Sequence, residues 1–152
     1  MRLLLGAISL LFIIVSCDEN RVFDEYKSIS DATWNKENVV DFEFKLDDTL
    51  SRNQVYLKIR NTVDYEFSNI YLFTKVVFPD GKVLVDTLEY EMTDAEGTWL
   101  GDGVSGMKNN LLYYKKDVVF YEKGIYKFSV QHGMRTNNLL GIQNVGLRIE
   151  RK

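Results

Sequence analysis

Three places in this sequence hold residue types that could do chemistry. A single cysteine, Cys17, follows an apolar run, and a single histidine, His132, lies near the other end of the chain. Between them, residues 92–106 hold several carboxylates among glycines. One cysteine cannot form a disulfide within the chain, and one cysteine with one histidine cannot build a zinc site. The chemistry to consider is therefore modification of Cys17, cation binding by the acidic loop and catalysis by the imidazole.

The surroundings of Cys17 predict a lipid attachment site. Arg2 gives a short positive start, and residues 3–15 form an apolar run. The run is shorter than the roughly 20 residues that a transmembrane helix needs, and it suits a secretory signal peptide. The ending Ile14-Val15-Ser16-Cys17 resembles the bacterial lipobox, in which the signal is cleaved before the cysteine and the new terminus is acylated. We expect residues 1–16 to be removed and lipid, including palmitate, to be attached to Cys17.

This lipid would be the protein's only covalent group, and no other cofactor is expected. Several acyl chains hold a protein stably on a bilayer, because each buried CH₂ group contributes about 0.8 kcal/mol. The expected location is therefore the cell envelope, on a membrane and specifically on the outer membrane. The alternative is an ordinary signal peptide followed by a free thiol, which is unusual in an exported protein.

The acidic loop at residues 92–106 has two interpretations. Asp94, Glu96 and Asp102 could ligate Ca²⁺, which prefers carboxylate oxygens from a pliable loop. Their spacing differs from that of an EF-hand, and no Gly-Lys-Ser/Thr follows that would make a phosphate-binding loop. The second interpretation, which we favour, is a connection between two sheets with Trp99 packed over the edge of the core. Exposed on such a connection, these four side chains would be a candidate surface for contact with a partner.

His132 lacks the partners that a catalytic base requires. The sequence has no Gly-x-Ser-x-Gly element, and Ser105 before Gly106 is only a fragment of one. No pair among the 22 acidic residues stands out as a candidate for glycosidic hydrolysis. We therefore predict no enzymatic activity and a structural or exposed loop position for His132.

The elements that position these residues are predicted to be strands. Residues 40–46, 55–60 and 145–150 alternate apolar and polar side chains, which is typical of half-buried strands. Residues 70–78 and 83–90 flank Pro79-Asp80-Gly81, a sequence suited to a tight turn, and so predict a hairpin.

Three further segments complete the predicted order of elements. Residues 118–121 and 125–130, on either side of a turn at 122–124, predict a second hairpin. Residues 106–114 could hold a helical turn, and residues 28–38, with Trp34, are expected to be irregular.

Together the pattern predicts one all-β domain, an antiparallel β-sandwich of jelly-roll or immunoglobulin-like kind. A small barrel is the alternative. We place the sandwich at residues 39–152, behind a lipidated cysteine and irregular lead-in at 17–38 and a signal peptide at 1–16.

Composition excludes some partners and leaves another open. The chain has 152 residues and a net charge of −3, and loss of Arg2 with the signal would make it one unit more negative. An acidic balance argues against nucleic acid as a partner. The nine tyrosines could include an exposed platform that stacks on sugar rings, so a surface glycan-binding lipoprotein is the alternative function.

Several segments in order along the chain resemble the gliding-motility lipoprotein family GldH of Bacteroidetes. Besides the Cys17 lipobox, the resemblance lies in residues 22–26, 54–61, 65–73, 97–103, 124–128, 134–135 and 141–150. It covers essentially the whole chain after Cys17.

The resemblance implies a non-enzymatic role. Members of that family are lipid-anchored in the cell envelope and are needed for surface gliding, although homologues also occur in species that do not glide. They are associated with other Gld lipoproteins and with the machinery that serves type IX secretion. The resemblance thus implies an assembly or scaffold component, with those proteins and the membrane lipid as partners. Only the lipid-bearing cysteine carries over to a residue of this chain, Cys17.

Overall fold

The computed structural model describes residues 19–152, so Cys17 and the predicted signal peptide lie outside the described residues. No helix in the described part is long and apolar enough to cross a membrane. That part forms strands joined by loops, with one short 3₁₀ turn, η1 (Ser30–Ala32). The strands are β1 (Arg21–Ser28), β2 (Thr33–Asn35), β3 (Val40–Leu46), β4 (Arg52–Thr62), β5 (Asn69–Val77), β6 (Val83–Glu91), β7 (Met107–Val119), β8 (Gly124–His132), β9 (Asn138–Leu140) and β10 (Ile142–Arg151).

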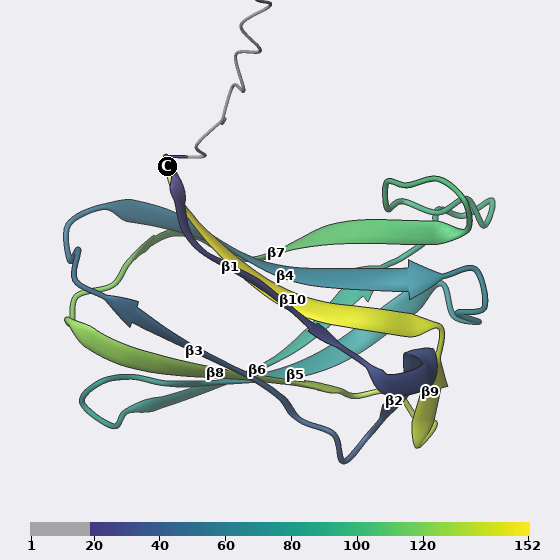
Figure 1. The fold of residues 1–152 in the computed structure, drawn as a ribbon, viewed down its shortest axis with the longest axis horizontal. Coiled ribbons are helices and arrows are strands. Elements are labelled where there is room, and N and C mark those ends of the chain that lie inside the picture. The colour runs from purple at the N-terminus through teal and green to yellow at the C-terminus, as the bar shows by residue number, and fades with distance from the viewer. Residues whose placement is uncertain (1–18) are drawn as a thin grey trace, which may run out of the picture.

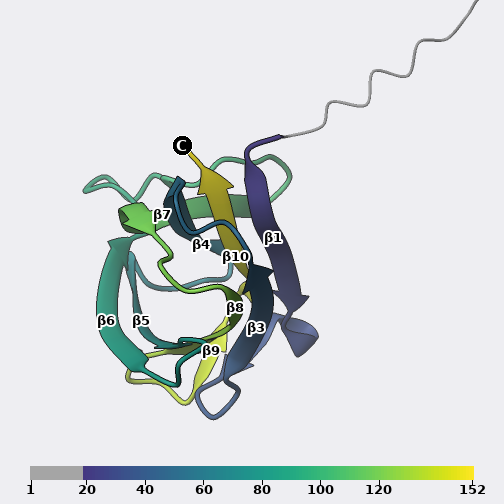
Figure 2. The ribbon, with the colours of Figure 1, turned by 90° about the vertical axis from the view of Figure 1, so that its left-hand side faces the viewer.

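Two four-stranded antiparallel sheets face each other (Figures 1 and 2). The first has the order β1-β10-β4-β7 and the second the order β3-β8-β5-β6. The short pair β2-β9 lies at one end of the molecule (Figure 1). The predicted antiparallel β-sandwich is therefore confirmed. The sandwich forms because strands such as β3 alternate strictly between apolar and polar residues. β3 buries its apolar positions and exposes Asp41, Glu43 and Lys45.

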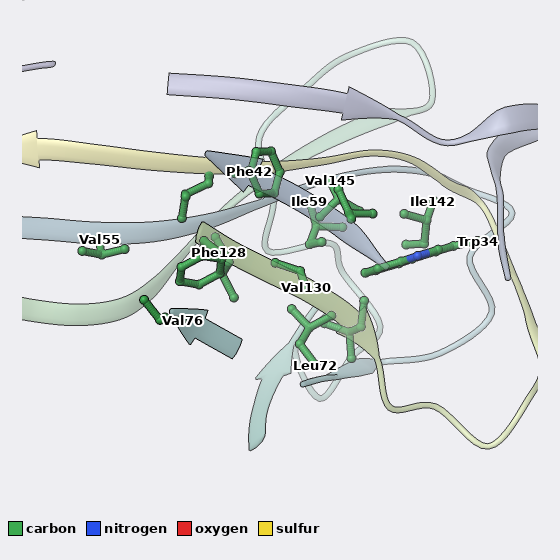
Figure 3. Close-up of a cluster of buried hydrophobic side chains, with 14 of the residues drawn as sticks. Trp34, Phe42, Val55, Ile59, Leu72, Val76, Phe128, Val130, Ile142 and Val145 are labelled. Atoms are coloured by element: carbon green, nitrogen blue, oxygen red, sulfur yellow. The ribbon is translucent and has the colours of Figure 1, made fainter. Parts of the chain in front are cut away.

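The core lies between the sheets and takes side chains from both (Figure 3). Ile59 and Val145 face it from the first sheet, and Leu72 and Phe128 face it from the second. Trp34, from β2, fills the end of this space and is completely buried, with its Nε1 donating to the carbonyl of Asn38 at 2.8 Å.

One predicted hairpin is confirmed and the other is wrong. β5 and β6 pair in register from Val77↔Val83, around the predicted turn. β7 and β8, by contrast, lie in different sheets, and the chain between them passes from one sheet to the other. Phe120, in that crossing, is buried against the Tyr126 ring at 5.2 Å. Burial of this aromatic side chain between the sheets explains why the chain crosses instead of turning back on itself.

Two expectations about irregular segments are also wrong. Residues 106–114 form no helical turn but lie in β7, because β4 supplies a paired strand along this segment. The lead-in at residues 17–38 contains β1, η1 and β2, and β1 pairs with β10 from Arg21↔Glu150 to Ser28↔Asn144. The sandwich therefore begins at Arg21 and not at residue 39.

Candidate functional site

The acidic loop at residues 92–106 connects the two sheets, as predicted. It leaves β6 in one sheet and enters β7 in the other. The Asp94 carboxylate accepts hydrogen bonds from the backbone N–H groups of Glu96, at 3.0 Å, and Thr98, at 2.7 Å. Trp99 packs on the edge of the core, with its ring centroid 6.4 Å from that of Tyr65.

These contacts give the aspartates of the loop structural roles. Asp94 closes a turn with its carboxylate, while Asp102 joins β7 through backbone hydrogen bonds with Asn109. Among the residues the structure describes, no three Asp, Glu, His or Cys side chains gather closely enough to hold a metal ion. Asp94, Glu96 and Asp102 are thus not brought together as Ca²⁺ ligands, although Glu96 and Asp102 stay exposed for other contacts.

His132 is a core residue and not a loop residue. It ends β8, is completely buried and packs edge-on against Trp34, with the ring centroids 5.3 Å apart. Its Nε2 lies 3.1 Å from the Trp34 carbonyl oxygen. Burial lowers the pKa of the imidazole below its usual value, against the opposing effect of that carbonyl. The ring is therefore neutral at pH 7 and closed off from any substrate in solution.

A connected polar cluster lies on the outer face of the first sheet, where the sequence patterns predicted only solvent-exposed positions. Lys58, on β4, forms an ion pair with Asp24 on β1, and its Nζ lies 3.7 Å from the centre of the Tyr26 ring. Arg60 lies over the same ring, with its Cζ 4.6 Å from the centroid. Arg148, on β10, donates to Asp24 at 2.8 Å and to Glu150 at 2.8 Å.

A glycine makes this close packing achievable. Gly146 stands on β10 between β1 and β4, opposite Tyr26 on one side and Lys58 on the other. A Cβ at this position would lie 2.8 Å from the Tyr26 ring and 2.9 Å from Lys58 Cε. Burial lowers the pKa of Lys58, with Asp24 opposing the shift, and burial raises the pKa of Tyr26, with Arg60 opposing it.

A tyrosine pair continues this surface onto β7. Tyr56 and Tyr113 are opposite each other on β4 and β7, with ring centroids 4.5 Å apart and hydroxyl oxygens 3.1 Å apart. Lys116 lies over the Tyr113 ring at 4.3 Å. We call the whole surface the Tyr–Arg face and define it by six residues from the four strands. They are Tyr26, Tyr56, Lys58, Arg60, Tyr113 and Arg148.

The Tyr–Arg face has the chemistry of a protein-contact surface. Tyr and Arg are enriched among the residues that dominate binding energy at protein interfaces. Here the cations are already paired or stacked, so little side-chain freedom remains to be lost on binding. A signal was present in the sequence, because Tyr56, Lys58 and Arg60 alternate with the core residues of β4. The pairing of β1 with β10, which brings Asp24 and Tyr26 to them, was not predicted.

Comparison with known proteins identifies the family of this chain. The family model for the GldH lipoprotein matches residues 21–149. The chain belongs to the GldH lipoprotein family. The match begins at the first residue of β1 and ends in β10, so the GldH unit includes every strand of both sheets. The predicted resemblance is confirmed.

Two GldH relatives match nearly the whole chain. The gliding motility lipoprotein GldH homolog of Christiangramia forsetii is 44% identical over 93% of this chain and 90% of its own length. The gliding motility lipoprotein GldH of Flavobacterium johnsoniae is 42% identical over 99% of this chain and 94% of its own length. Among solved structures, the infectious bursal disease virus VP2 subviral particle aligns at a TM-score of 0.43 and 13% identity, over 96% of this chain and 37% of that one.

Proposed function

We propose that this GldH-family protein is a non-enzymatic scaffold of the gliding motility and type IX secretion machinery, anchored by lipid on Cys17 to the outer membrane. The observation that carries the proposal is the Tyr–Arg face, a preorganised polar and aromatic surface that spans all four strands of one sheet. Membership of a family whose relatives are named gliding motility lipoproteins supports the same role. The partners would be other Gld envelope lipoproteins and components of that machinery.

The geometry favours contact with a folded protein over turnover of a substrate. Lys58 and Asp24 neutralise each other, and Arg148 is held between two carboxylates. Groups fixed in this way make a rigid surface that a complementary protein can cover without first ordering it. Tyr113, which is exposed, and Arg60, which is half-buried, would then make the direct contacts.

A deletion strain complemented with variants tests this function. Colony spreading and secretion through the type IX route would be scored for the wild type, Cys17→Ala, Arg60→Ala and Tyr113→Ala. We expect Cys17→Ala to abolish membrane fractionation, colony spreading and secretion. Arg60→Ala and Tyr113→Ala should impair spreading and secretion, while the purified proteins keep their melting temperatures. Cross-linking in envelopes should recover other Gld lipoproteins with the wild type and less of them with Tyr113→Ala.

Tyr71→Ala is the matched control, since Tyr71 is an exposed tyrosine on the outer face of the other sheet. If deletion of the gene affects neither spreading nor secretion, the scaffold function is wrong. If the deletion has an effect that Arg60→Ala and Tyr113→Ala both complement fully, the Tyr–Arg face is not the contact surface.

A second candidate function, binding of a surface glycan, rests on the outer face of the second sheet. Tyr71 and Phe73 are exposed neighbours on β5, and a shallow groove of about 320 Å³ beside them is lined by Phe73, Lys75, Val85 and Gln131. Aromatic rings side by side on a strand can stack on sugars. Loss of binding to envelope polysaccharide in Phe73→Ala, with spreading and secretion unaffected in Tyr113→Ala, would favour this function over the scaffold.

A further inference from the structure

One end of the sandwich gathers the start of β1 and the end of β10 with three strand connections. Arg21 pairs with Glu150, and Arg52, the first residue of β4, pairs with Val119 at the end of β7. The connections at residues 47–51 and 120–123, which run between the two sheets, and the β5–β6 turn at 78–82 close the same end. We call this end the tether end, because the chain leaves it toward Cys17. It lies to the left in Figure 1 and faces the viewer in Figure 2.

Two large apolar side chains stand exposed in these connections. Leu50 is 88% exposed and Tyr121 is 81% exposed. The Leu50 turn is held by Asp48, whose carboxylate accepts from the backbone N–H groups of Leu50, at 2.9 Å, and Ser51, at 3.0 Å. The Ser51 hydroxyl also donates to this carboxylate, at 2.6 Å, and that bond together with the two backbone bonds lowers the pKa of Asp48 to about 2, so the turn keeps its charged cap throughout the physiological range.

Tyr121 is held by a comparable frame. The neighbouring Phe120 is buried, and the backbone carbonyl of Glu122 accepts from the Tyr126 hydroxyl at 2.8 Å. The Glu122 carboxylate accepts from the backbone N–H of Asp80 at 3.2 Å, which joins this connection to the β5–β6 turn. Leu50 and Tyr121 are thus presented to solvent on fixed backbone.

Several charges at the tether end are paired. Lys82 lies 2.7 Å from Asp80, Lys152 lies 2.6 Å from Asp117, and Arg151 lies 3.4 Å from Asp48. These pairs neutralise part of the charge that this end carries. An apolar contact through Leu50 and Tyr121 is the interaction that its surface supports.

The length of the chain between Cys17 and Arg21 decides which surface Leu50 and Tyr121 can contact. Only Asp18, Glu19 and Asn20 separate Cys17 from Arg21. An extended chain spans at most about 3.6 Å per residue, so Arg21 lies within about 14 Å of the lipid-bearing residue. A protein held so closely must turn its tether end toward the bilayer. The lipid surface is therefore what Leu50 and Tyr121 would contact.

We propose that the tether end rests on the bilayer, with Leu50 and Tyr121 at the membrane interface. Tyrosine favours this region, because its ring is apolar and its hydroxyl remains hydrated. The long axis of the sandwich then points away from the membrane and presents the 92–106 loop at its far end (Figure 1). This proposal rests on the lipidation of Cys17 in the proposed function.

Spin labels on the lipidated full chain test the contact. Leu50→Cys, Tyr121→Cys and the control Val104→Cys would each be labelled with a nitroxide in vesicles of phosphatidylethanolamine and phosphatidylglycerol. Val104 is 83% exposed, and it lies in the 92–106 loop at the far end. Accessibility to a water-soluble nickel chelate should fall several-fold at positions 50 and 121 on vesicle binding and stay unchanged at position 104. Equal accessibility at all three positions would overturn the proposal.

The wild-type chain separates failure of the anchor from failure of the contact. An acylated Cys17 has no free thiol, so the wild type should take up no label and should show the mass of the attached lipid. Labelling of the wild type, with no lipid mass, would overturn both proposals. Lipid mass with full nickel accessibility at positions 50 and 121 would overturn only the contact. The double variant Leu50→Ser/Tyr121→Ser should keep its melting temperature, since both side chains are exposed.

Discussion

At the scale of single residues, Lys58 shows how an outer-face position becomes structural. Only 8% of its side chain is exposed, and its partner Asp24 is 18% exposed. Charged side chains rarely leave water to this extent unless they are paired. The pair reaches from β4 to β1 over Gly146 of the intervening strand, and Tyr26 covers the ammonium group. It therefore fastens the edge strand β1 to the sheet.

Removing this ammonium group should be costly. Lys58→Met keeps most of the buried stem but leaves Asp24 without one of its charged partners, so we expect the free energy of unfolding to fall by about 2 kcal/mol. Urea denaturation measures the change. Lys127→Met is the control, because Lys127 is exposed and lies 3.9 Å from Glu43, and we expect a change within about 0.5 kcal/mol there. Equal effects in the two variants would contradict a structural role for the Lys58 pair.

His132 should make the stability depend on pH. Burial lowers the pKa of the folded-state imidazole, so below about pH 6.5 the unfolded chain binds the proton more readily than the folded one. Stability should therefore be fully present above that pH and fall as the pH drops from 7 toward 5, with this group contributing at most about 1.4 kcal/mol per pH unit. Urea denaturation at several pH values should give a flatter profile for His132→Phe. An unchanged slope would show that the imidazole is not responsible.

At the scale of elements, the conformation of the 92–106 loop is held by the hydrogen bonds of its turn. Asp94 accepts two backbone hydrogen bonds, whereas Asp102 is held by its own backbone pairing to Asn109. The two carboxylates of the same loop thus have different roles.

The edge strand β6 also uses a carboxylate structurally. Asp86 accepts a hydrogen bond from the Tyr114 hydroxyl at 2.6 Å and pairs with Lys115 across the open side of the sandwich. A charge directed inward on an edge strand discourages pairing with another chain.

The two aspartates of the loop can be separated by mutation. Asp94→Ala should lower the free energy of unfolding by about 1 kcal/mol, because two backbone donors lose their acceptor. Asp102→Ala should change it little. Thermal unfolding measures both, and adding Ca²⁺ or EDTA to the wild type should leave the melting temperature unchanged. A rise with Ca²⁺ that both substitutions remove would restore the cation interpretation.

At the scale of the whole molecule, both ends of the described chain contribute to one sheet. β1 and β10 pair along their length, and Phe23 of β1 packs on Phe42 and Phe44 of the opposite sheet. Trp34 of β2 then closes one end of the core. The first strands are therefore part of the folding unit and not a spacer between lipid and domain.

Truncation tests this boundary. A chain starting at residue 19 should fold, whereas one starting at residue 39 should not, because it lacks Phe23, Ile29 and Trp34 and exposes the edge of β10. Losing a buried aromatic side chain costs about 3–5 kcal/mol, and typical domains have about 5–15 kcal/mol in all. Near-ultraviolet circular dichroism and amide NMR dispersion report the outcome. A folded product from the shorter chain would contradict the role given to β1 and β2.

Much of the fold was determined by local sequence. Alternation in β3, β4 and β10 predicted their buried faces, and Pro79-Asp80-Gly81 predicted the β5–β6 hairpin, because strand faces and tight turns depend on neighbouring residues. The sequence also predicts the lipid site at Cys17 and carries the family resemblance. The position of Leu50 between two predicted strands follows from the same patterns. Tyr121, by contrast, was assigned to a strand at residues 118–121 and lies in the connection after β7.

Tertiary structure alone decided the rest. Residues 118–130 have the pattern of a hairpin, yet burial of Phe120 sends β7 and β8 to different sheets. The ion pair beneath the Tyr–Arg face joins Asp24 to Arg148 across most of the chain's length, and His132 is buried against Trp34, which lies 98 residues before it. Such contacts are decided by which strands become neighbours, and strand neighbours are chosen by the packing of the whole core and not by any local run of residues.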